Sequence, residues 1–278
     1  MSKRLLITAI VLLMILIGLM GFKFAGMVSE SESDHTASVS DTESSENQET
    51  SDSEIEENID SSAEESAEST SETEYDPEQD SRFFDTDSYL ICANKKHPLP
   101  DGYEPSDLAW PEVDVVSARF TLRWDAAVAL EEMFAAAAED GVTLLLQSGY
   151  RSAEYQSQLW NYYAGLYGAD DADTISSRPG YSDHQTGLAA DIGSASNPSA
   201  DLTQSFIDTA EGQWLYKHAY EYGFIMRYPV GKQDITGYAY EPWHYRYIGV
   251  EEATAIYTTD PDLSFEEYYG ISGGDYAD

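Results

Sequence analysis

The chain has 278 residues with 52 acidic and 14 basic side chains, which gives a formal net charge of -38. This acidic balance argues against nucleic-acid binding, because nucleic acids are bound by a basic face. The single cysteine, Cys92, excludes an intramolecular disulfide. We expect Cys92 to lie in a strand entering the fold as a buried, inert thiol rather than a reactive one.

The first 28 residues predict a membrane anchor. Lys3 and Arg4 precede an apolar run over residues 5–22, close to the ~18–20 residues that cross a bilayer as a helix. A cleaved secretory signal would have a shorter apolar core and a small-residue cleavage site, and neither is evident. We therefore expect residues 1–28 to be an uncleaved, single-pass anchor in the cell membrane. The basic residues predict that its amino end stays inside and that the rest of the chain is extracytoplasmic.

Residues 29–82 have the composition of a spacer. From Ser29 to Asp80 the chain is mostly Ser, Glu, Asp and Thr, with no Lys or Arg and almost no large apolar side chain. Such a segment cannot bury enough surface to offset the entropy lost on ordering. We expect a disordered, self-repelling tether between the anchor and a domain over residues 83–278. A specific binding role for the acidic run is the alternative.

Residues 83–278 are rich enough in aromatic and aliphatic side chains for one globular domain of ordinary size. Helices are expected at 122–138, 152–166 and 203–222, and strands at 142–147, 187–193, 224–228 and 244–248. Gly141 and Gly223 supply stops for the first and third helices, and Ser152 caps the second. This irregular alternation predicts an α+β fold rather than regular βαβ winding.

Two short motifs in the second half contain the residue types of a hydrolytic zinc site. His184 and Asp191 lie in Ser-Asp-His-Gln-Thr-Gly-Leu-Ala-Ala-Asp, and Glu241 and His244 lie in Glu-Pro-Trp-His-Tyr-Arg-Tyr. A catalytic zinc takes three protein ligands and keeps a fourth position for water, whose proton a nearby glutamate can accept. Pro242 excludes a helix interior between Glu241 and His244, so this is not the helical metalloprotease pattern. We expect a loop that leads into a strand.

The strand over residues 187–193 leaves room for an ion. Its face with Asp191 otherwise carries Gly187, Ala189 and Gly193. His184 lies an odd number of residues from Asp191, so an unbroken strand would place the two side chains on opposite faces. We expect a turn over residues 185–187 that folds His184 back toward the metal.

Four separated motifs carry a family resemblance that extends from about residue 90 to about residue 250. They are Asn-Lys-Lys-His-Pro-Leu-Pro at 94–100, Gln-Ser-Gly-Tyr-Arg-Ser at 147–152, Pro-Gly-Tyr-Ser-Asp-His-Gln-Thr-Gly at 179–187 and Glu-Pro-Trp-His-Tyr-Arg-Tyr at 241–247. In these motifs the chain resembles the VanY-type zinc D-alanyl-D-alanine carboxypeptidases, a family that also contains L,D-carboxypeptidases of cell-wall peptides. The resemblance implies a D,D-peptidase or hedgehog-like fold, in which a small antiparallel sheet is flanked by helices and carries the zinc site.

Carried over position by position, the resemblance makes His184, Asp191 and His244 the ligands of a Zn²⁺ ion and Glu241 the general base. Arg151 falls where the family has an arginine that binds the scissile carbonyl oxygen or the developing oxyanion. A structural salt bridge is the alternative for Arg151.

Gln156 and Ser182 occupy positions where relatives have polar residues that contact the terminal D-alanine of the substrate. His97 lies in a family motif, and we expect it to serve packing or hydrogen bonding.

The function implied by the resemblance is removal of the terminal D-alanine from peptidoglycan stem peptides or their precursors. The expected anchor would tether this enzyme to the membrane, and we expect it to be a monomer. Two alternatives use the same chemistry, namely L,D-carboxypeptidase action on the tetrapeptide and endopeptidase action within the stem. A third is a non-catalytic wall-binding module. The third is disfavoured because none of the four central residues is lost.

Overall fold

The computed structural model describes residues 75–276. The anchor expected over residues 1–28 and nearly all of the tether expected over residues 29–82 lie outside the described residues. Within the described part, no helix combines the length and the apolar character that a membrane crossing requires.

The folded region begins before residue 83, where the domain boundary was predicted. Two short 3-10 helices, η1 (Pro77–Gln79) and η2 (Ser81–Phe83), each have an aspartate side chain that accepts a hydrogen bond at the amino end. The Glu78 carboxylate also accepts a hydrogen bond from the backbone N–H of Ser272, at 2.8 Å. These polar residues have a partner at the far end of the chain, which local composition does not reveal.

The central sheet has four antiparallel strands in the order β3-β4-β6-β5. The strands are β3 (Leu144–Ser148), β4 (Ala189–Ser194), β5 (Phe224–Met226) and β6 (His244–Tyr247). A separate two-stranded sheet pairs β1 (Leu108–Ala109) with β2 (Leu122–Arg123). The order brings β4 beside β6 and sets Asp191 opposite His244. The predicted α+β fold with a small antiparallel sheet is confirmed.

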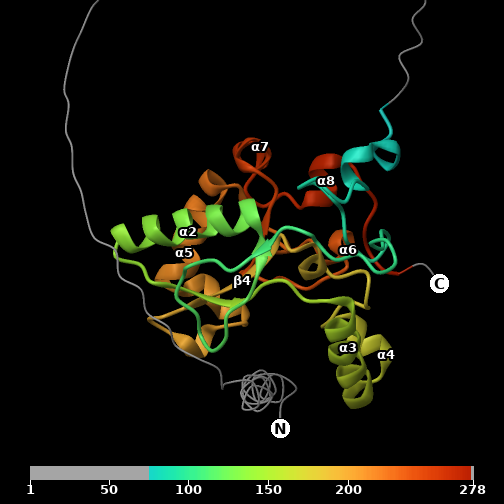
Figure 1. Ribbon diagram of the computed structural model, residues 1–278, viewed down its shortest axis with the longest axis horizontal. Helices are drawn as coiled ribbons and strands as arrows, with labels where there is room; N and C mark the ends of the chain where they lie inside the picture. The colour runs from blue at the N-terminus through green and yellow to red at the C-terminus, as the bar shows by residue number, and fades with distance from the viewer. Residues whose placement is uncertain (1–74, 277–278) are drawn as a thin grey trace, which may run out of the picture. The chain divides into compact units, whose positions relative to one another are not determined.

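Helices surround this sheet (Figure 1). They are α2 (Trp124–Glu139), α3 (Ala153–Tyr167), α4 (Ala169–Asp173), α5 (Ala210–His218), α6 (Gln233–Thr236), α7 (Val250–Thr259) and α8 (Phe265–Tyr269). As predicted, Ser152 caps α3, because its hydroxyl accepts a hydrogen bond from the N–H of Tyr155 at 3.2 Å. The α3–α4 hairpin projects from the body of the domain, and Gln156 is the buried residue of α3.

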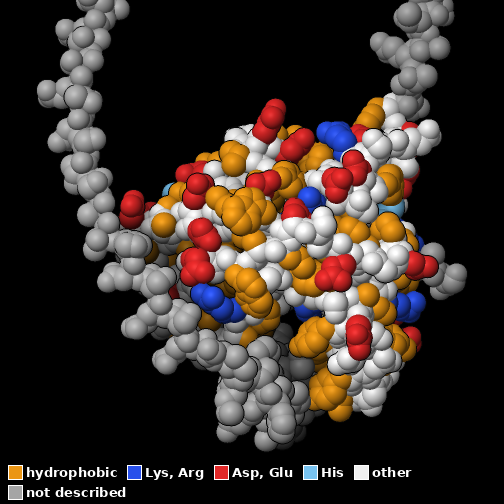
Figure 2. Space-filling model, viewed as in Figure 1, with side chains coloured by type: hydrophobic (Ala, Val, Ile, Leu, Met, Phe, Trp, Pro, Cys, Tyr) orange, Lys and Arg blue, Asp and Glu red, His pale blue; other side chains and the backbone are white. Residues whose placement is uncertain are grey.

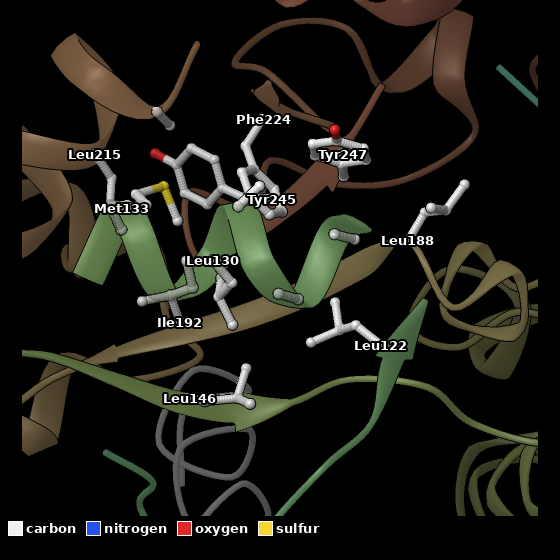
Figure 3. Close-up of a cluster of buried hydrophobic side chains, with 14 of the residues drawn as sticks. Leu122, Leu130, Met133, Leu146, Leu188, Ile192, Leu215, Phe224, Tyr245 and Tyr247 are labelled. Carbon is white, nitrogen blue, oxygen red and sulfur yellow. The ribbon is translucent and has the colours of Figure 1, made fainter. Parts of the chain in front are cut away.

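One face of the sheet packs against α2 and forms the main core (Figure 3). Leu146 and Ile192, from β3 and β4, are fully buried with Leu130 and Met133 of α2. Tyr245 of β6 joins the same cluster. Because successive strand side chains point to opposite faces, this packing directs the alternate residues of β4 and β6 to the other side of the sheet.

The opposite face of β5 belongs to a second core. Ile225 lies there with Ile256 of α7 and Phe265 of α8. Figure 1 shows α7 and α8 on this side of the domain, with the segment that contains η1 and η2 beside α8. Contacts between the rings of Phe83 and Phe265, whose centroids are 5.9 Å apart, join the two segments.

The single helix predicted over residues 203–222 is divided into η5 (Gln204–Asp208), α5 and η6 (Ala219–Tyr222). The hydroxyl of Thr209 accepts a hydrogen bond from the N–H of Gly212 at 3.0 Å and starts α5. Gly212 packs so closely on the preceding turn that a Cβ there would lie 2.1 Å from the carbonyl oxygen of Phe206. The break therefore depends on a cap and a close backbone approach.

Cys92 is buried as predicted, but it lies in an irregular segment and not in a strand. Burial raises the pKa of its thiol far above the ordinary value.

On the face shown in Figure 2, acidic side chains are spread widely and Lys and Arg are few. Hydrophobic side chains gather over the α3–α4 hairpin in the same view. Tyr155 and Leu166 of α3 are each about half exposed, at 53% and 51%. The helix that begins directly after Arg151 therefore presents apolar surface to solvent.

Candidate metal centre

Three elements bring His184, Asp191 and His244 together. The 3-10 turn η3 (Asp183–Thr186) ends at Gly187, whose φ of 71° is left-handed and turns the chain into β4. His184 is thereby folded back toward Asp191, as predicted. Asp191 and His244 are cross-strand partners on β4 and β6. The three side chains are buried, and one potential ligand atom from each lies within 4.8 Å of the others.

Hydrogen bonds to the outer ring nitrogens assign which nitrogen of each histidine faces the centre. Nδ1 of His184 lies 2.8 Å from the carbonyl oxygen of Gly149 and donates to it. Nε2 of His184 is then left facing Oδ2 of Asp191 at 3.3 Å. Nε2 of His244 lies 3.2 Å from Oδ2 of Asp183, so Nδ1 of His244 points inward. Partners of this kind orient the histidine ligands of metal sites.

The residues fit a zinc ion. Oδ1 of Asp191 is buried and accepts no hydrogen bond from the described part of the chain. Nδ1 of His244 is 3.1 Å from it but lacks hydrogen-bond geometry. A buried carboxylate oxygen without a donor is costly, and a cation would satisfy it. Two imidazoles and one carboxylate are also a typical ligand set of catalytic zinc.

The pKa shifts of the three groups differ in direction. Burial lowers the pKa of His184 and so favours its neutral, metal-binding form. Burial acts against ionisation of Asp191, but the His184 and His244 imidazoles together outweigh it and hold the pKa of Asp191 below its ordinary value. Burial would also lower the pKa of His244, yet its hydrogen bond to Asp183 and the negative charge of nearby Asp191 raise that pKa to about 9.

Glu241 lies beside the metal centre on the turn that precedes β6. The N–H of His244 donates to the carbonyl oxygen of Glu241 at 3.1 Å, which closes the turn containing Pro242. Oε2 of Glu241 is 3.7 Å from Nδ1 of His244, and 22% of the Glu241 side chain is exposed. Burial raises the pKa of Glu241 to about 7, although the charge of nearby His244 opposes the rise. A carboxyl group with that pKa can accept and return a proton near neutral pH.

Arg151 occupies the junction between β3 and α3. Its backbone N–H donates to the carbonyl oxygen of His184 at 3.2 Å, which places it next to the metal centre. Its Nε is buried and has no hydrogen-bond partner within residues 75–276. Because its guanidinium forms no ion pair with a described residue, the alternative of a structural salt bridge has no support in the described chain.

Gln156 and Ser182 lie close to these residues in sequence and are both buried. Nε2 of Gln156 donates to Oγ of Ser176 at 2.9 Å and to the carbonyl oxygen of Ser177 at 2.7 Å. These bonds tie α3 to the segment before η3 and leave Oε1 of Gln156 without a donor among the described residues. Ser182 directly precedes η3, but its side chain does not cap that turn. Substrate contact by either residue stays a prediction.

Asp183 was missed by the sequence reasoning. Its Oδ2 is near Nε2 of His244, and its Oδ1 accepts a hydrogen bond from Nη1 of Arg246. Burial would raise the pKa of Asp183, but Arg246, His244 and Arg227 together outweigh burial and keep that pKa below the ordinary value. Its position directly before His184 was a signal, since it places a carboxylate inside a metal-site motif. Only the fold shows that Asp183, in η3, contacts His244 on β6.

His97 forms side-chain hydrogen bonds, as we expected. Its Nδ1 lies 2.9 Å from Oδ1 of Asn94, and its Nε2 lies 2.8 Å from Oε2 of Glu78.

Known proteins resemble this chain over the part that contains the site. The model of the VanY family, described as D-alanyl-D-alanine carboxypeptidase, matches residues 119–250. YodJ of Bacillus subtilis (strain 168) is 45% identical over 188 residues, which are 66% of this chain and 67% of that protein.

Two solved structures extend the comparison. The LdcB LD-carboxypeptidase has 44% identity and a TM-score of 0.62, and the match covers 66% of this chain and 86% of that one. A mutant of the D,D-pentapeptidase VanY from a VanB-type vancomycin resistance cassette, in complex with Zn(II), has 35% identity and a TM-score of 0.52. That match covers 65% of this chain and 98% of that one.

Proposed function

Because the chain belongs to the VanY family of D-alanyl-D-alanine carboxypeptidases, we propose that it removes the terminal D-alanine from peptidoglycan stem peptides by zinc-dependent hydrolysis. The observation that carries this proposal is the convergence of His184, Asp191 and His244 beside Glu241. Arg151 adds, next to the same centre, a donor that has no partner among the described residues.

The proposed mechanism assigns one role to each residue. Nε2 of His184, the Asp191 carboxylate and Nδ1 of His244 would hold the zinc ion, which when bound would lower the pKa of water and polarise a carbonyl group. Glu241 takes a proton from the attacking water and delivers it to the leaving amine, and a pKa of about 7 suits both transfers. Arg151 donates to the carbonyl oxygen as negative charge develops on it.

We extend the proposal to the recognition of D-alanine by Gln156 and Ser182. Oε1 of Gln156 has no donor in the described chain, and a substrate N–H group would supply one. Gln156→Leu removes this acceptor with little change in volume, and it also removes the hydrogen bonds to Ser176 and Ser177, so its unfolding temperature is measured beside its kinetics. We expect that variant to raise KM more than it lowers kcat.

Two reactions of this kind differ in the peptide that is cut. The family description favours D,D-carboxypeptidase action on a pentapeptide ending in D-Ala-D-Ala. The second candidate, L,D-carboxypeptidase action on the tetrapeptide, is favoured by the higher identity and TM-score of the LdcB match.

Matched pentapeptide and tetrapeptide decide between these reactions. Each peptide is incubated with the purified protein and analysed by mass spectrometry. Preferred loss of one alanine from the pentapeptide supports the first reaction, and preferred loss from the tetrapeptide supports the second. A cut within the stem would instead assign endopeptidase action.

The expected anchor and acidic tether lead to a proposal about location. They would keep the domain outside the cell and near the membrane, where a flexible tether raises the local concentration of enzyme at its substrate. Fractionation of cells that make the full chain, or the chain without residues 1–28, tests this. Equal distribution of both forms would contradict the anchor.

A further inference from the structure

A buried row of charged side chains connects the last helix to the proposed metal ligand His244. Glu266, on α8, accepts two hydrogen bonds from Arg227, from Nη1 to Oε2 at 2.7 Å and from Nη2 to Oε1 at 2.6 Å. Nε of Arg227 lies 4.0 Å from Oδ1 of Asp183. Oδ2 of the same Asp183 reaches Nε2 of His244 at 3.2 Å. The row thus ends on the ring whose other nitrogen faces the metal centre.

Further contacts fix both ends of this row. Arg246 donates through Nη1 to Oδ1 of Asp183, and through Nη2 to the carbonyl oxygens of Tyr89 and Ile91 at 2.9 and 2.7 Å. Nδ2 of Asn94 donates to Oε1 of Glu266 at 3.0 Å. The N-terminal segment of the domain therefore holds the outer members in place.

The four charged members of the row are two arginines and two carboxylates, and all are at most 2% exposed. They are Asp183, Arg227, Arg246 and Glu266. Burial of charges is costly, and buried ion pairs can often be replaced by apolar side chains without loss of stability. Stability alone is thus a weak reason for such a row.

A backbone hydrogen bond and the two oxygens of Asp183 determine how the row meets the His244 ring. Arg227 directly follows β5, and its N–H donates to the carbonyl oxygen of His244, the first residue of β6, at 3.1 Å. Two guanidinium groups face Oδ1 of Asp183, which leaves Oδ2 for the His244 ring. The row therefore fixes the orientation of that ring.

We propose that Glu266 is a positioning residue for His244, acting through Arg227 and Asp183. Without the Glu266 carboxylate, both buried arginines face the single carboxylate of Asp183. Asp183 is then drawn toward Arg227, its hydrogen bond to His244 weakens, and excess positive charge lies near the cation. This inference rests on the proposed metal centre and extends it to a helix beyond residues 119–250, the range matched by the family model.

The test compares two adjacent glutamates on the same helix in the full-length protein. Glu266→Gln interrupts the row. Glu267→Gln is the matched control, because Glu267 pairs with Lys232 at 2.7 Å and is partly exposed. Zinc affinity is measured by competition with a chromogenic chelator, and ligand geometry by the absorption spectrum of the Co(II) form. Unfolding temperatures of the metal-free proteins report the structural cost.

We expect Glu266→Gln to weaken zinc binding about tenfold, at the low end of the effect of partners that orient metal ligands. Its Co(II) bands should shift. Glu267→Gln should keep the affinity and the spectrum of the parent. A Glu266→Gln protein that unfolds at a lower temperature but keeps the affinity and spectrum of the parent would make Glu266 merely structural and overturn the inference.

A double-mutant cycle tests the route. Because Glu266 acts through Asp183, Asp183→Asn combined with Glu266→Gln should lose no more zinc affinity than Asp183→Asn alone. Additive losses would overturn the route.

A second variant is used if Glu266→Gln does not fold. Arg227→Lys breaks the paired hydrogen bonds and keeps the charge, and an unchanged zinc affinity of Arg227→Lys would overturn the inference. A parent protein that binds no zinc would refute the metal centre itself, whereas a zinc-binding parent with an unaffected variant refutes only the role of Glu266.

Discussion

Replacement of Glu241 by Gln should separate proton transfer from metal binding. The amide fills the space of the carboxylate, and Oε2 of Glu241, at 3.7 Å from Nδ1 of His244, is not one of the three proposed ligand atoms. Burial already disfavours the ionised carboxylate, so a neutral side chain should be accepted by the fold. We therefore expect Glu241→Gln to keep its zinc and its unfolding temperature.

Turnover should fall steeply in the same variant. General-base groups typically contribute about 10²–10⁴-fold, which corresponds to about 3–5 kcal/mol in the activation free energy. The assay is release of D-alanine under saturating peptide, with zinc content measured on the same samples. Glu211→Gln is a suitable control, because Glu211 is a buried glutamate bonded to Ser196, and it should retain the activity of the parent.

Two results would refute this reasoning. Loss of zinc from Glu241→Gln would make Glu241 a ligand and leave Asp191 in need of another role. Full turnover with zinc retained would show that another group moves the proton.

Three further predictions follow from individual contacts. His184→Ala and His244→Ala should each lose zinc, since two remaining ligands hold the ion poorly; metal analysis showing full occupancy would contradict the ligand assignment. Arg151→Ala should raise the activation barrier by about 3 kcal/mol and so lower kcat more than it raises KM. If steady-state kinetics show a change in KM alone, Arg151 is a ground-state binding residue. Glu78→Gln should destabilise the domain near neutral pH. Although burial opposes it, hydrogen bonds from His97 and Ser272 lower the pKa of Glu78 to about 2. The stability difference between parent and variant is thus fully present above the ordinary pKa of about 4.5 and disappears as the pH falls toward 2. Denaturation at several pH values checks this, and a difference that persists at pH 2 would contradict it.

The sequence was most informative where chemistry and local geometry agree. The residue types of His184, Asp191 and His244 identified a candidate metal site, and the odd spacing of His184 and Asp191 required the turn that the structure contains at Gly187. Pro242 likewise required a loop before β6. In each case a single residue restricts the backbone within a few positions.

The features that the sequence did not predict depend on contacts between distant segments. The break in the helix over residues 203–222 requires the close approach of Gly212 to Phe206. The role of Asp183 requires the pairing of β4 with β6. Glu266 lies 39 positions from its partner Arg227, and its sequence neighbourhood contains no metal-site motif. Such contacts can be seen only once the fold is known.

Restoration of activity to the metal-free protein by added zinc tests the central claim most directly. The protein is stripped with a chelator, zinc is added in small increments, and D-alanine released from the preferred stem peptide is measured at each step. The site formed by His184, Asp191 and His244 predicts that release rises in proportion to zinc and reaches its plateau at about one ion per chain. D-alanine release by the stripped protein at the full rate, or no release at any zinc concentration from either peptide, would contradict the account.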